Sequence, residues 1–331
     1  MPASPPSEPL RIAVLDDFQE AALRCADWTS IPGAQVTAFR DHIEDSAALV
    51  ERLARFQVVC LMRERTPVPA EVLLNLPALR LIVTTGMWNA GLDIEEAVRR
   101  GITVCGTSAI QSGTPELTWL LILALARRLP AEQASMIAGD WQTGLGTDLE
   151  GSTLGILGLG RIGARIAQVG NAFGMRVLAW SQNLTAERAA EAGARLAPRD
   201  ELLRDSDFVT VHMKLSDRTR GLIGERELAL MKHSAFLINT SRGPIVSEPA
   251  LVDALRAGRI AGAGLDVFDV EPLPPGHALR TLPNAIVTPH IGYVTQRAYA
   301  DFYAQVVENI RAWVAGAPVR RLTHNRLPQA A

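Results

Sequence analysis

The sequence predicts an α/β protein that contains two parallel β-sheets covered by helices. Its 331 residues are enough for two domains, at roughly 150 residues per domain, each with its own core. Short β-branched runs alternate with helical patterns in two successive series, as in βαβ units. A glycine-rich turn joins the first strand of the second series to the helix that follows it.

The first series occupies the N-terminal third of the chain. Its expected strands cover residues 11–15, 35–39, 57–62, 81–85 and 103–105, and its expected helices cover residues 45–55, 69–75 and 92–100. Such short β-branched runs are typical of buried strands in a parallel sheet. Thr114, Pro115 and Glu116 then provide an N-cap, a first-turn proline and an early acid, which predict a long apolar helix ending near Arg128.

The second series follows a polar, glycine-rich passage at residues 139–151. Its expected strands cover residues 152–157, 175–180, 208–213, 235–240, 261–267 and 285–288. Its expected helices cover residues 162–173, 186–192, 200–205, 225–230 and 249–257, and a last helix covers residues 295–315. Six strands separated by helices predict a doubly wound parallel sheet of the dinucleotide-binding type.

Charge and composition exclude several classes of partner. The chain has 33 Lys and Arg against 35 Asp and Glu without a basic cluster, so nucleic acid is not an expected partner. The longest uncharged apolar stretch, near residues 117–126, is shorter than the about 20 residues that cross a bilayer, and residues 1–9 lack a secretory signal. Cys25, Cys60 and Cys105 form no CxxC pair and are expected to be buried thiols. We therefore expect a cytoplasmic protein without a membrane partner.

Gly158, Gly160 and Gly163 form a GxGxxG turn after an apolar strand and before an amphipathic helix. In this arrangement the first glycine permits a tight turn, the second lets the backbone approach a pyrophosphate, and the third lets helix and strand pack closely. The free N–H groups at the start of the helix would then bind the pyrophosphate. This context predicts a dinucleotide site, and the alternative is an ordinary tight turn between strand and helix.

The residues that select the cofactor depart from the NAD pattern. An acid about 20 residues after the glycine turn holds the ribose 2′-OH in NAD-specific sites. Here the second strand ends in Trp180-Ser181-Gln182-Asn183, which contains no acid to repel a 2′-phosphate. Lys214, after the next strand, could supply a positive charge, although a solvated loop lysine is an equal alternative. The sequence thus favours NADP slightly and leaves NAD open.

Arg242, Glu271 and His290 each follow a different strand of the second series. In an open α/β sheet, ligands lie beyond the carboxyl ends of the strands. Arginine can hold a carboxylate with two donors, histidine can exchange a proton near neutral pH, and a carboxylate can orient the histidine. These residue types suit hydride transfer between a 2-keto acid and a nicotinamide. The structural alternatives are a surface ion-pair partner, a solvated turn residue and a core histidine, respectively.

The other histidines are expected to be structural. His212 lies inside an apolar strand and is expected to be packed. His42, His233, His277 and His324 lie in polar segments and are expected to face solvent. No spacing of His, Cys and Asp predicts a metal site.

Several motifs occur in an order that resembles the D-isomer-specific 2-hydroxyacid dehydrogenase family, and the match extends over nearly the whole chain. They are Gly139-Asp140-Trp141, Gly151-Ser152-Thr153-Leu154-Gly155 before the glycine turn, Asn239-Thr240-Ser241-Arg242-Gly243, Leu265-Asp266-Val267-Phe268 with Glu271-Pro272-Leu273-Pro274, and Thr288-Pro289-His290-Ile291-Gly292. The resemblance implies a Rossmann-type sheet at residues 112–291, inserted into a flavodoxin-like substrate-binding domain made of residues 1–111 and 292–331. It also implies a homodimer formed through the dinucleotide domain.

The resemblance also implies roles for individual residues. Arg242 would bind the substrate, Glu271 and His290 would form the acid/base pair, and Asp266 would contact the nicotinamide carboxamide. The remaining implied contacts are Arg161 and Ile162 at the pyrophosphate, Thr240 and Ser241 on the nicotinamide side, Gly292 as a further cofactor contact, and Gly86, Met87 and Trp88 in the substrate loop. The implied partner is a small 2-keto or 2-hydroxy acid.

This chain departs from the family pattern in three places. Trp88 stands where the family's substrate loop has its second glycine, Ser181 replaces the acidic cofactor residue, and Lys214 replaces a common proline. An indole in the substrate loop should reshape the pocket, so the identity of the acid does not carry over from the family. Formate dehydrogenase relatives pair the histidine with Gln, so Glu271 argues against that activity. A non-catalytic dinucleotide sensor and a dehydrogenase of another small anion, such as phosphite, are the alternatives.

Overall fold

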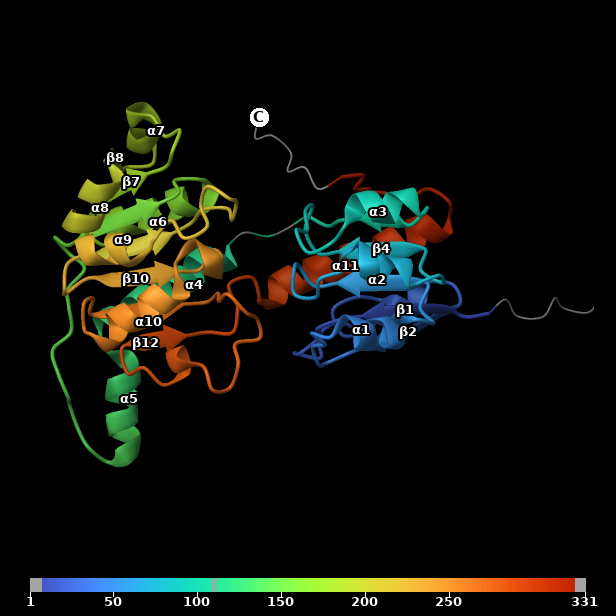
Figure 1. The fold of residues 1–331 in the computed structure, drawn as a ribbon, viewed down its shortest axis with the longest axis horizontal. Helices are drawn as coiled ribbons and strands as arrows, with labels where there is room; N and C mark the ends of the chain where they lie inside the picture. Colours follow the sequence, from blue (N-terminus) through green and yellow to red (C-terminus); the bar gives the residue numbers. More distant parts are fainter. Residues whose placement is uncertain (1–7, 109, 111, 325–331) are drawn as a thin grey trace, which may run out of the picture. The chain divides into compact units, whose positions relative to one another are not determined.

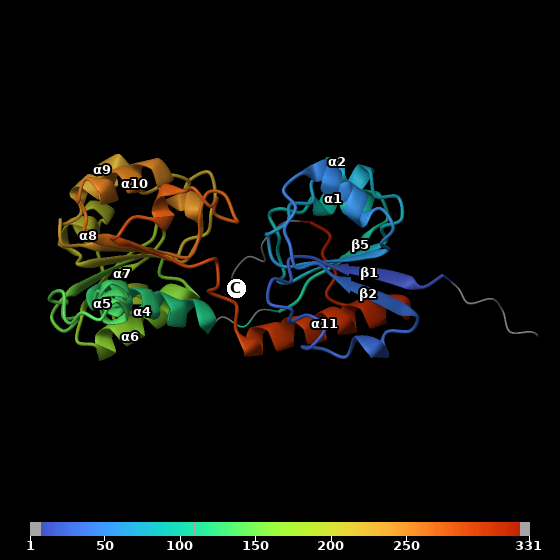
Figure 2. The same ribbon diagram turned by 90° about the horizontal axis from the view of Figure 1, so that it is seen from below.

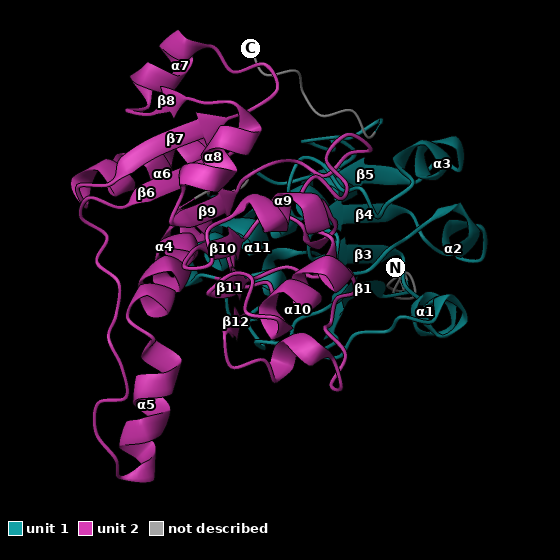
Figure 3. Ribbon diagram, turned by 60° about the vertical axis from the view of Figure 1, so that its left-hand side comes forward, with its two compact units in different colours: residues 1–110, 295–331 teal, residues 111–294 magenta. Residues whose placement is uncertain are grey.

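The computed structural model describes residues 8–108, 110 and 112–324, and the chain divides into two compact units (Figures 1 and 3). Unit 1 consists of residues 1–110 and 295–331, and unit 2 consists of residues 111–294. The two ends of the chain therefore build one unit, and the middle of the chain builds the other.

Unit 1 is a parallel five-stranded sheet in the order β2-β1-β3-β4-β5, as in flavodoxin-like folds. Its elements are β1 (Leu10–Val14), η1 (Trp28–Ser30), β2 (Ala34–Ala38), α1 (Ser46–Leu53), β3 (Val58–Leu61), α2 (Ala70–Leu74), β4 (Leu81–Thr84), α3 (Ile94–Arg99), β5 (Thr103–Cys105) and α11 (Gln296–Val314). Helices α1, α2 and α3 cover one face of the sheet, and α11 covers the other (Figure 2). The C-terminal helix thus completes the N-terminal sheet.

Unit 2 is a parallel seven-stranded sheet in the order β12-β11-β10-β9-β6-β7-β8. Its elements are α4 (Gly113–Ala126), α5 (Leu129–Ala138), β6 (Thr153–Leu157), α6 (Arg161–Ala172), β7 (Arg176–Trp180), α7 (Ala186–Glu191), β8 (Arg195–Leu196), α8 (Arg199–Asp205), β9 (Phe208–Val211), α9 (Glu225–Leu230), β10 (Phe236–Asn239), η2 (Gly243–Ile245), α10 (Glu248–Arg256), β11 (Gly262–Leu265), η3 (Ala278–Arg280) and β12 (Ala285–Val287). Apolar residues of α4 and α6 pack on one face, and those of α8, α9 and α10 pack on the other (Figure 2). The order in which successive strands are added to the sheet reverses between β6 and β9, and doubly wound sheets bind their ligands at such a switch point. The predicted α/β class with a Rossmann-type doubly wound sheet is confirmed.

Two features of unit 2 differ from the expected elements. The long helix ends at Ala126, and Arg128 adopts a left-handed φ of 52° before α5 begins. Pro130 has no N–H to donate to the Ala126 carbonyl, which instead accepts from the Thr147 N–H at 2.7 Å. The seventh strand, β8, has only two residues and therefore leaves no alternating pattern in the sequence.

His42 is not the solvent-facing residue that its polar segment predicts, because it pairs with a buried carboxylate in unit 1. Its Nδ1 lies 2.8 Å from Oδ1 of Asp16, and both side chains are less than a tenth exposed. The Thr66 hydroxyl donates to Oδ2 of the same carboxylate at 2.6 Å. The hydrogen bond that His42 donates to the Asp16 carboxylate raises the pKa of His42 above its ordinary value, although burial opposes this shift. The pair therefore favours a protonated imidazole in the folded state.

His42→Asn is expected to make the stability of the protein less dependent on pH. An asparagine amide can still donate to Asp16 but carries no charge. Because the folded pKa of His42 lies above its unfolded value of about 6.5, the stabilisation is complete below that pH and is lost as pH rises through the folded pKa. The free energy of unfolding of the wild type should thus exceed that of the variant by about 1 kcal/mol at a pH below the titration of His42, and by less at a pH above it. Urea unfolding at the two pH values measures this difference. A stability difference that is the same at both pH values would contradict this assignment.

Two of the three cysteines are buried, as expected, and the third is not. Cys60 and Cys105 are buried, and burial raises the pKa of the Cys105 thiol to about 11. Cys25 is only half buried, so the expected burial of this residue is wrong.

Within residues 8–108, 110 and 112–324, no helix combines the length and the apolar character that a membrane span needs.

Candidate active site

The glycine turn has the geometry that a pyrophosphate site requires. Gly158 has a φ of 102°, and a Cβ on Gly163 would lie 2.2 Å from the Gly158 carbonyl oxygen. Gly160 is the N-cap of α6, and a Cβ there would meet no heavy atom within 4 Å. Arg161 and Ile162 form the first turn of the helix. The second glycine thus leaves open space in front of free N–H groups, so the residues present fit a dinucleotide.

Ser181 ties the end of β7 to the glycine turn. Its hydroxyl oxygen accepts a hydrogen bond from the Leu159 N–H at 2.9 Å, which leaves the hydroxyl proton available for another acceptor. Lys214 lies three residues after β9 and is exposed. The described part of this strand end, residues 181–183, carries no carboxylate.

The turn after β10 holds Arg242 through the buried side chain of Asn239. The Asn239 amide donates to the Arg242 carbonyl at 2.9 Å, and its oxygen accepts from the Ser241 N–H at 3.0 Å. The Arg242 guanidinium donates to the Ser241 carbonyl at 2.7 Å. The Thr240 and Thr118 hydroxyls lie 2.8 Å apart, and the Ser241 hydroxyl donates to the Met213 carbonyl. The main chain around Arg242 is therefore held by the Asn239, Thr240 and Ser241 side chains in addition to its own guanidinium.

Glu271 and His290 form a hydrogen-bonded pair. Oε2 of Glu271 lies 2.5 Å from Nδ1 of His290, and its Oε1 accepts from the Phe268 N–H at 2.9 Å. Burial alone would raise the pKa of Glu271, but the hydrogen bond and charge of His290, the Phe268 N–H and the charge of Arg242 together lower it. Glu271 is therefore a carboxylate at neutral pH. The carboxylate binds Nδ1, so Nε2 is the histidine nitrogen that is left to exchange a proton with a ligand.

Asp266 fixes the turn that carries His290. Its carboxylate accepts from the Thr288 hydroxyl at 2.6 Å and from the N–H groups of Ile291 and Gly292, both at 2.8 Å. The Asp266 side chain is 1% exposed. His290 adopts a φ of 52°, which is uncommon for a residue with a Cβ and is often found at functional sites. Three donors on both sides of His290 thus hold it in this conformation.

The expected substrate loop lies in unit 1, directly after β4. Gly86 has a φ of 107°, and its N–H donates to the Thr107 hydroxyl at 2.9 Å. A Cβ on Gly86 would lie 2.6 Å from a guanidinium nitrogen of Arg63. Met87 is 40% exposed and Trp88 is half buried. This loop therefore presents two large apolar side chains next to an arginine.

The structure brings some predicted site residues together and adds others. Arg242, Glu271 and His290 lie close to one another at the carboxyl edge of the unit 2 sheet. Sequence reasoning missed Asn239 as the residue that positions Arg242, although a buried amide at the end of an apolar strand is a usable signal. It also missed the anchoring contacts of Asp266, because no pattern shows which backbone a buried carboxylate reaches.

Comparison with known proteins identifies relatives over most of the chain. A model of the NAD binding domain of D-isomer specific 2-hydroxyacid dehydrogenases matches residues 119–292. A glyoxylate reductase from Aeropyrum pernix is 42% identical over 259 residues, which cover 75% of this chain and 77% of that protein. A glyoxylate reductase from Thermococcus gammatolerans is 37% identical over 308 residues, covering 87% and 91%. The crystal structure of a phosphoglycerate oxidoreductase from Vibrio cholerae is 37% identical, with a TM-score of 0.88 and coverage of 93% and 100%.

Proposed function

Because the chain belongs to the D-isomer-specific 2-hydroxyacid dehydrogenase family, we propose that it interconverts a 2-keto acid and a D-2-hydroxy acid by hydride transfer with a nicotinamide cofactor. The observation that carries the proposal is the Glu271–His290 pair, at 2.5 Å, within range of the charge of Arg242. Together these groups provide a proton donor and an anion-binding donor at one sheet edge. Gly86, Met87 and Trp88 of unit 1 are assigned to the side chain of the acid.

Each catalytic group has a defined task in the reduction direction. Arg242 binds the substrate carboxylate with two donors and polarises the neighbouring carbonyl. His290 donates its Nε2 proton to the carbonyl oxygen, which becomes the hydroxyl of the product. Glu271 holds Nδ1 and stabilises the positive charge of the imidazolium before this transfer. In the oxidation direction the same histidine removes the hydroxyl proton.

The cofactor would be held by the glycine turn and by the residues beyond it. Gly158, Gly160 and Gly163, with Arg161 and Ile162 in the first turn of α6, would bind the pyrophosphate. Thr240, Ser241 and Gly292 would line the nicotinamide side, and one oxygen of Asp266 could still accept from a carboxamide. A bound nicotinamide supplies or accepts the hydride. We favour NADP, because Ser181 has a hydroxyl proton to donate at a strand end that has no carboxylate.

The proposal is tested by a panel of acids with both cofactors. Glyoxylate, hydroxypyruvate, pyruvate and bulkier 2-keto acids are each mixed with the protein and NADPH or NADH, and the loss of absorbance at the reduced nicotinamide band is followed. Turnover of at least one acid is expected. The reverse reaction is assayed with D-2-hydroxy acids and with phosphite. If the protein binds the cofactors but turns over none of these compounds in either direction, a dinucleotide sensor is favoured instead.

Ser181→Asp is expected to weaken NADPH binding by about tenfold or more while leaving NADH binding nearly unchanged. A carboxylate at the end of β7 repels a 2′-phosphate and can accept from a ribose 2′-OH. The measurement is the quenching of protein fluorescence by each reduced cofactor. Ser234→Asp is the matched control, because Ser234 is exposed at the opposite, amino end of β10. Tighter binding of NADH than of NADPH by the wild type would refute the preference for NADP.

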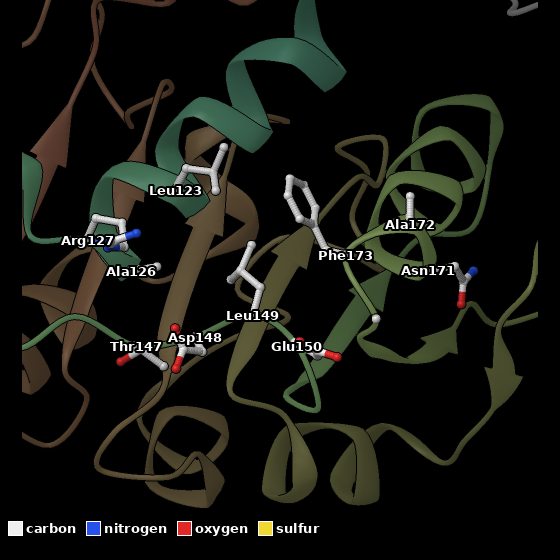
Figure 4. A pocket seen from close by; sticks show the side chains of 11 residues that line it. Leu123, Ala126, Arg127, Thr147, Asp148, Leu149, Glu150, Asn171, Ala172 and Phe173 are labelled. Atoms are coloured by element: carbon white, nitrogen blue, oxygen red, sulfur yellow. The ribbon is translucent and has the colours of Figure 1, made fainter.

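We also propose that the chain forms a homodimer through unit 2. Residues 129–148, here called the arm, comprise α5 and the extended segment that returns from it, and Figure 3 shows α5 projecting from the rest of the unit. The arm exposes large apolar side chains that a monomer would leave in water, namely Leu129, Met136, Ile137, Trp141 and Leu145, at 51, 57, 80, 69 and 94%. A pocket of about 810 Å³ lies at its base, and Leu123, Leu149 and Phe173 point into it (Figure 4). An apolar arm beside a pocket that apolar side chains enter fits a second copy of this chain.

Replacing both Ile137 and Trp141 with Glu is expected to convert the dimer into a monomer. The two side chains are among the most exposed apolar groups of the arm, and burying two carboxylates in an interface is costly. Light scattering after size exclusion should give twice the 35.7 kDa chain mass for the wild type and the single mass for the variant. Leu74→Glu, on an exposed apolar residue of α2, is the control and should remain dimeric. A monomeric wild type would contradict the dimer.

A further inference from the structure

His277 is not the solvent-facing residue that its polar segment predicts. Its Nε2 lies 3.0 Å from Oε1 of Glu248, and the two side chains are about a quarter exposed or less. Its Nδ1 accepts from the Leu279 N–H at 3.3 Å, so the ring caps the short helix η3. With Nδ1 as acceptor, the ring nitrogen that carries a proton toward Glu248 is Nε2. The imidazole therefore links η3 to the first residue of α10.

The same carboxylate also holds the loop that carries Glu271. Oε2 of Glu248 accepts from the Asp269 N–H at 3.2 Å, two residues before Glu271. His277 lies six residues after Glu271, so Glu248 bonds the loop both before and after Glu271. The loop is closed further by Arg280, whose Nε donates to the Pro274 carbonyl at 2.9 Å.

A second contact joins this loop to the turn that carries Arg242. A Cβ on Gly243 would lie 2.7 Å from the Asp269 nitrogen and still closer to the Phe268 carbonyl. Gly243 therefore packs directly against the peptide whose N–H Glu248 accepts. Two segments consequently contact each other at the Gly243 backbone and at the Glu248 carboxylate, namely residues 242–248 and residues 268–277. The first segment contains Arg242, and the second contains Glu271.

We propose that Glu248 and His277 are positioning residues that hold the Glu271 loop in register with the Arg242 turn. This inference rests on the proposed function, since that function gives Arg242 and Glu271 the roles that the link would support. Neither Glu248 nor His277 contacts the reacting atoms. Their effect is exerted through the placement of Glu271, and with it the orientation of His290. Misplacement by about 1 Å of a group in an active site can lower the rate by up to about 10²-fold.

Two variants test the proposal against a merely structural role. His277→Asn retains an oxygen that can cap η3, as Nδ1 does, but is too short to reach Glu248. Glu248→Ala removes the bonds to Asp269 and His277. Glu225→Ala is the matched control, because it also removes an acid from the first position of a helix, α9, but does not affect the Glu271 loop. Glu248→Ala and His277→Asn are expected to lower kcat for the keto acid by about tenfold and to narrow the pH range of activity, with cofactor affinity unchanged. The double variant should lose no more than Glu248→Ala alone, because both act through one link.

Hydrogen exchange provides a readout that does not depend on turnover. Amides in peptides covering residues 268–277 should exchange faster in Glu248→Ala and in His277→Asn than in the wild type or Glu225→Ala. Wild-type kcat and wild-type exchange in His277→Asn would overturn the proposal, because the ring would then only cap η3. If the wild type itself reduces no keto acid, the proposed function fails, and the exchange measurement still decides whether the link holds the loop.

Discussion

His290→Asn is expected to lower kcat by about 10²–10⁴-fold in both directions of the reaction. The asparagine amide can occupy the place of Nδ1 and donate to Glu271, so the pair keeps its hydrogen bond. The variant lacks the second ring nitrogen, which leaves no group to donate a proton to the carbonyl oxygen. The Asp266 contacts to residues 288, 291 and 292 hold the turn independently of the imidazole, so the fold should be unaffected.

Steady-state kinetics and cofactor titration on the same preparations check this result. Cofactor affinity should equal that of the wild type, because the glycine turn lies on other strands. His233→Asn, on an exposed histidine before β10, is the control and should keep full activity. Full activity in His290→Asn would show that another group supplies the proton.

Glu271→Gln separates the task of the carboxylate from that of His290. The lowered pKa of Glu271 keeps this carboxyl ionised near neutral pH, so the wild type holds Nδ1 of His290 with a charged acceptor. Glu271→Gln removes that charge but retains an oxygen for the Phe268 N–H. The variant should therefore lower kcat for reduction by less than His290→Asn does, measured side by side at neutral pH.

Arg242→Ala is expected to lower kcat/KM for the keto acid by about 10²–10³-fold. Loss of charge-assisted hydrogen bonds to the substrate carboxylate amounts to roughly 3–4 kcal/mol, and about 1.4 kcal/mol corresponds to a factor of ten. The Asn239 side chain, which bonds the Arg242 carbonyl and the Ser241 N–H, should keep the turn in place after truncation. The change therefore reports on the guanidinium and not on a disordered loop.

Two further variants define what the guanidinium contributes. Arg242→Lys keeps the charge but offers no paired donors, so its kcat/KM should lie between those of the wild type and Arg242→Ala. Arg259→Ala, on an exposed arginine after α10, should have wild-type kinetics. If Arg242→Ala changes cofactor affinity and leaves the KM of the keto acid unaltered, the guanidinium binds the cofactor and not the substrate.

Much of the fold was predictable, because its signals are local. The glycine turn is recognisable from three glycines between a strand and a helix; Gly158 has the positive φ of a tight turn, and a Cβ on Gly163 would meet the Gly158 carbonyl oxygen. Helix α5 was not predictable: its apolar residues face solvent, so it lacks the amphipathic period by which a packed helix is recognised. The break between α4 and α5 follows from Pro130, which has no N–H for the Ala126 carbonyl. That carbonyl accepts instead from the Thr147 N–H, which is distant in the sequence.

Residue type and hydrophobic period were enough to predict the α/β class and to place Arg242, Glu271 and His290 at strand ends, because both are properties of neighbouring positions. Which of these side chains meet depends on how distant segments pack. Glu271 and His290 are separated by 19 residues and Asp266 and Gly292 by 26, yet each pair is within hydrogen-bond distance, because adjacent parallel strands bring their carboxyl ends to one edge. His42 and His277 have carboxylate partners for the same reason, which the polarity of their own segments could not show. The order of strands in a sheet arises from long-range packing, and a single sequence carries no local record of it.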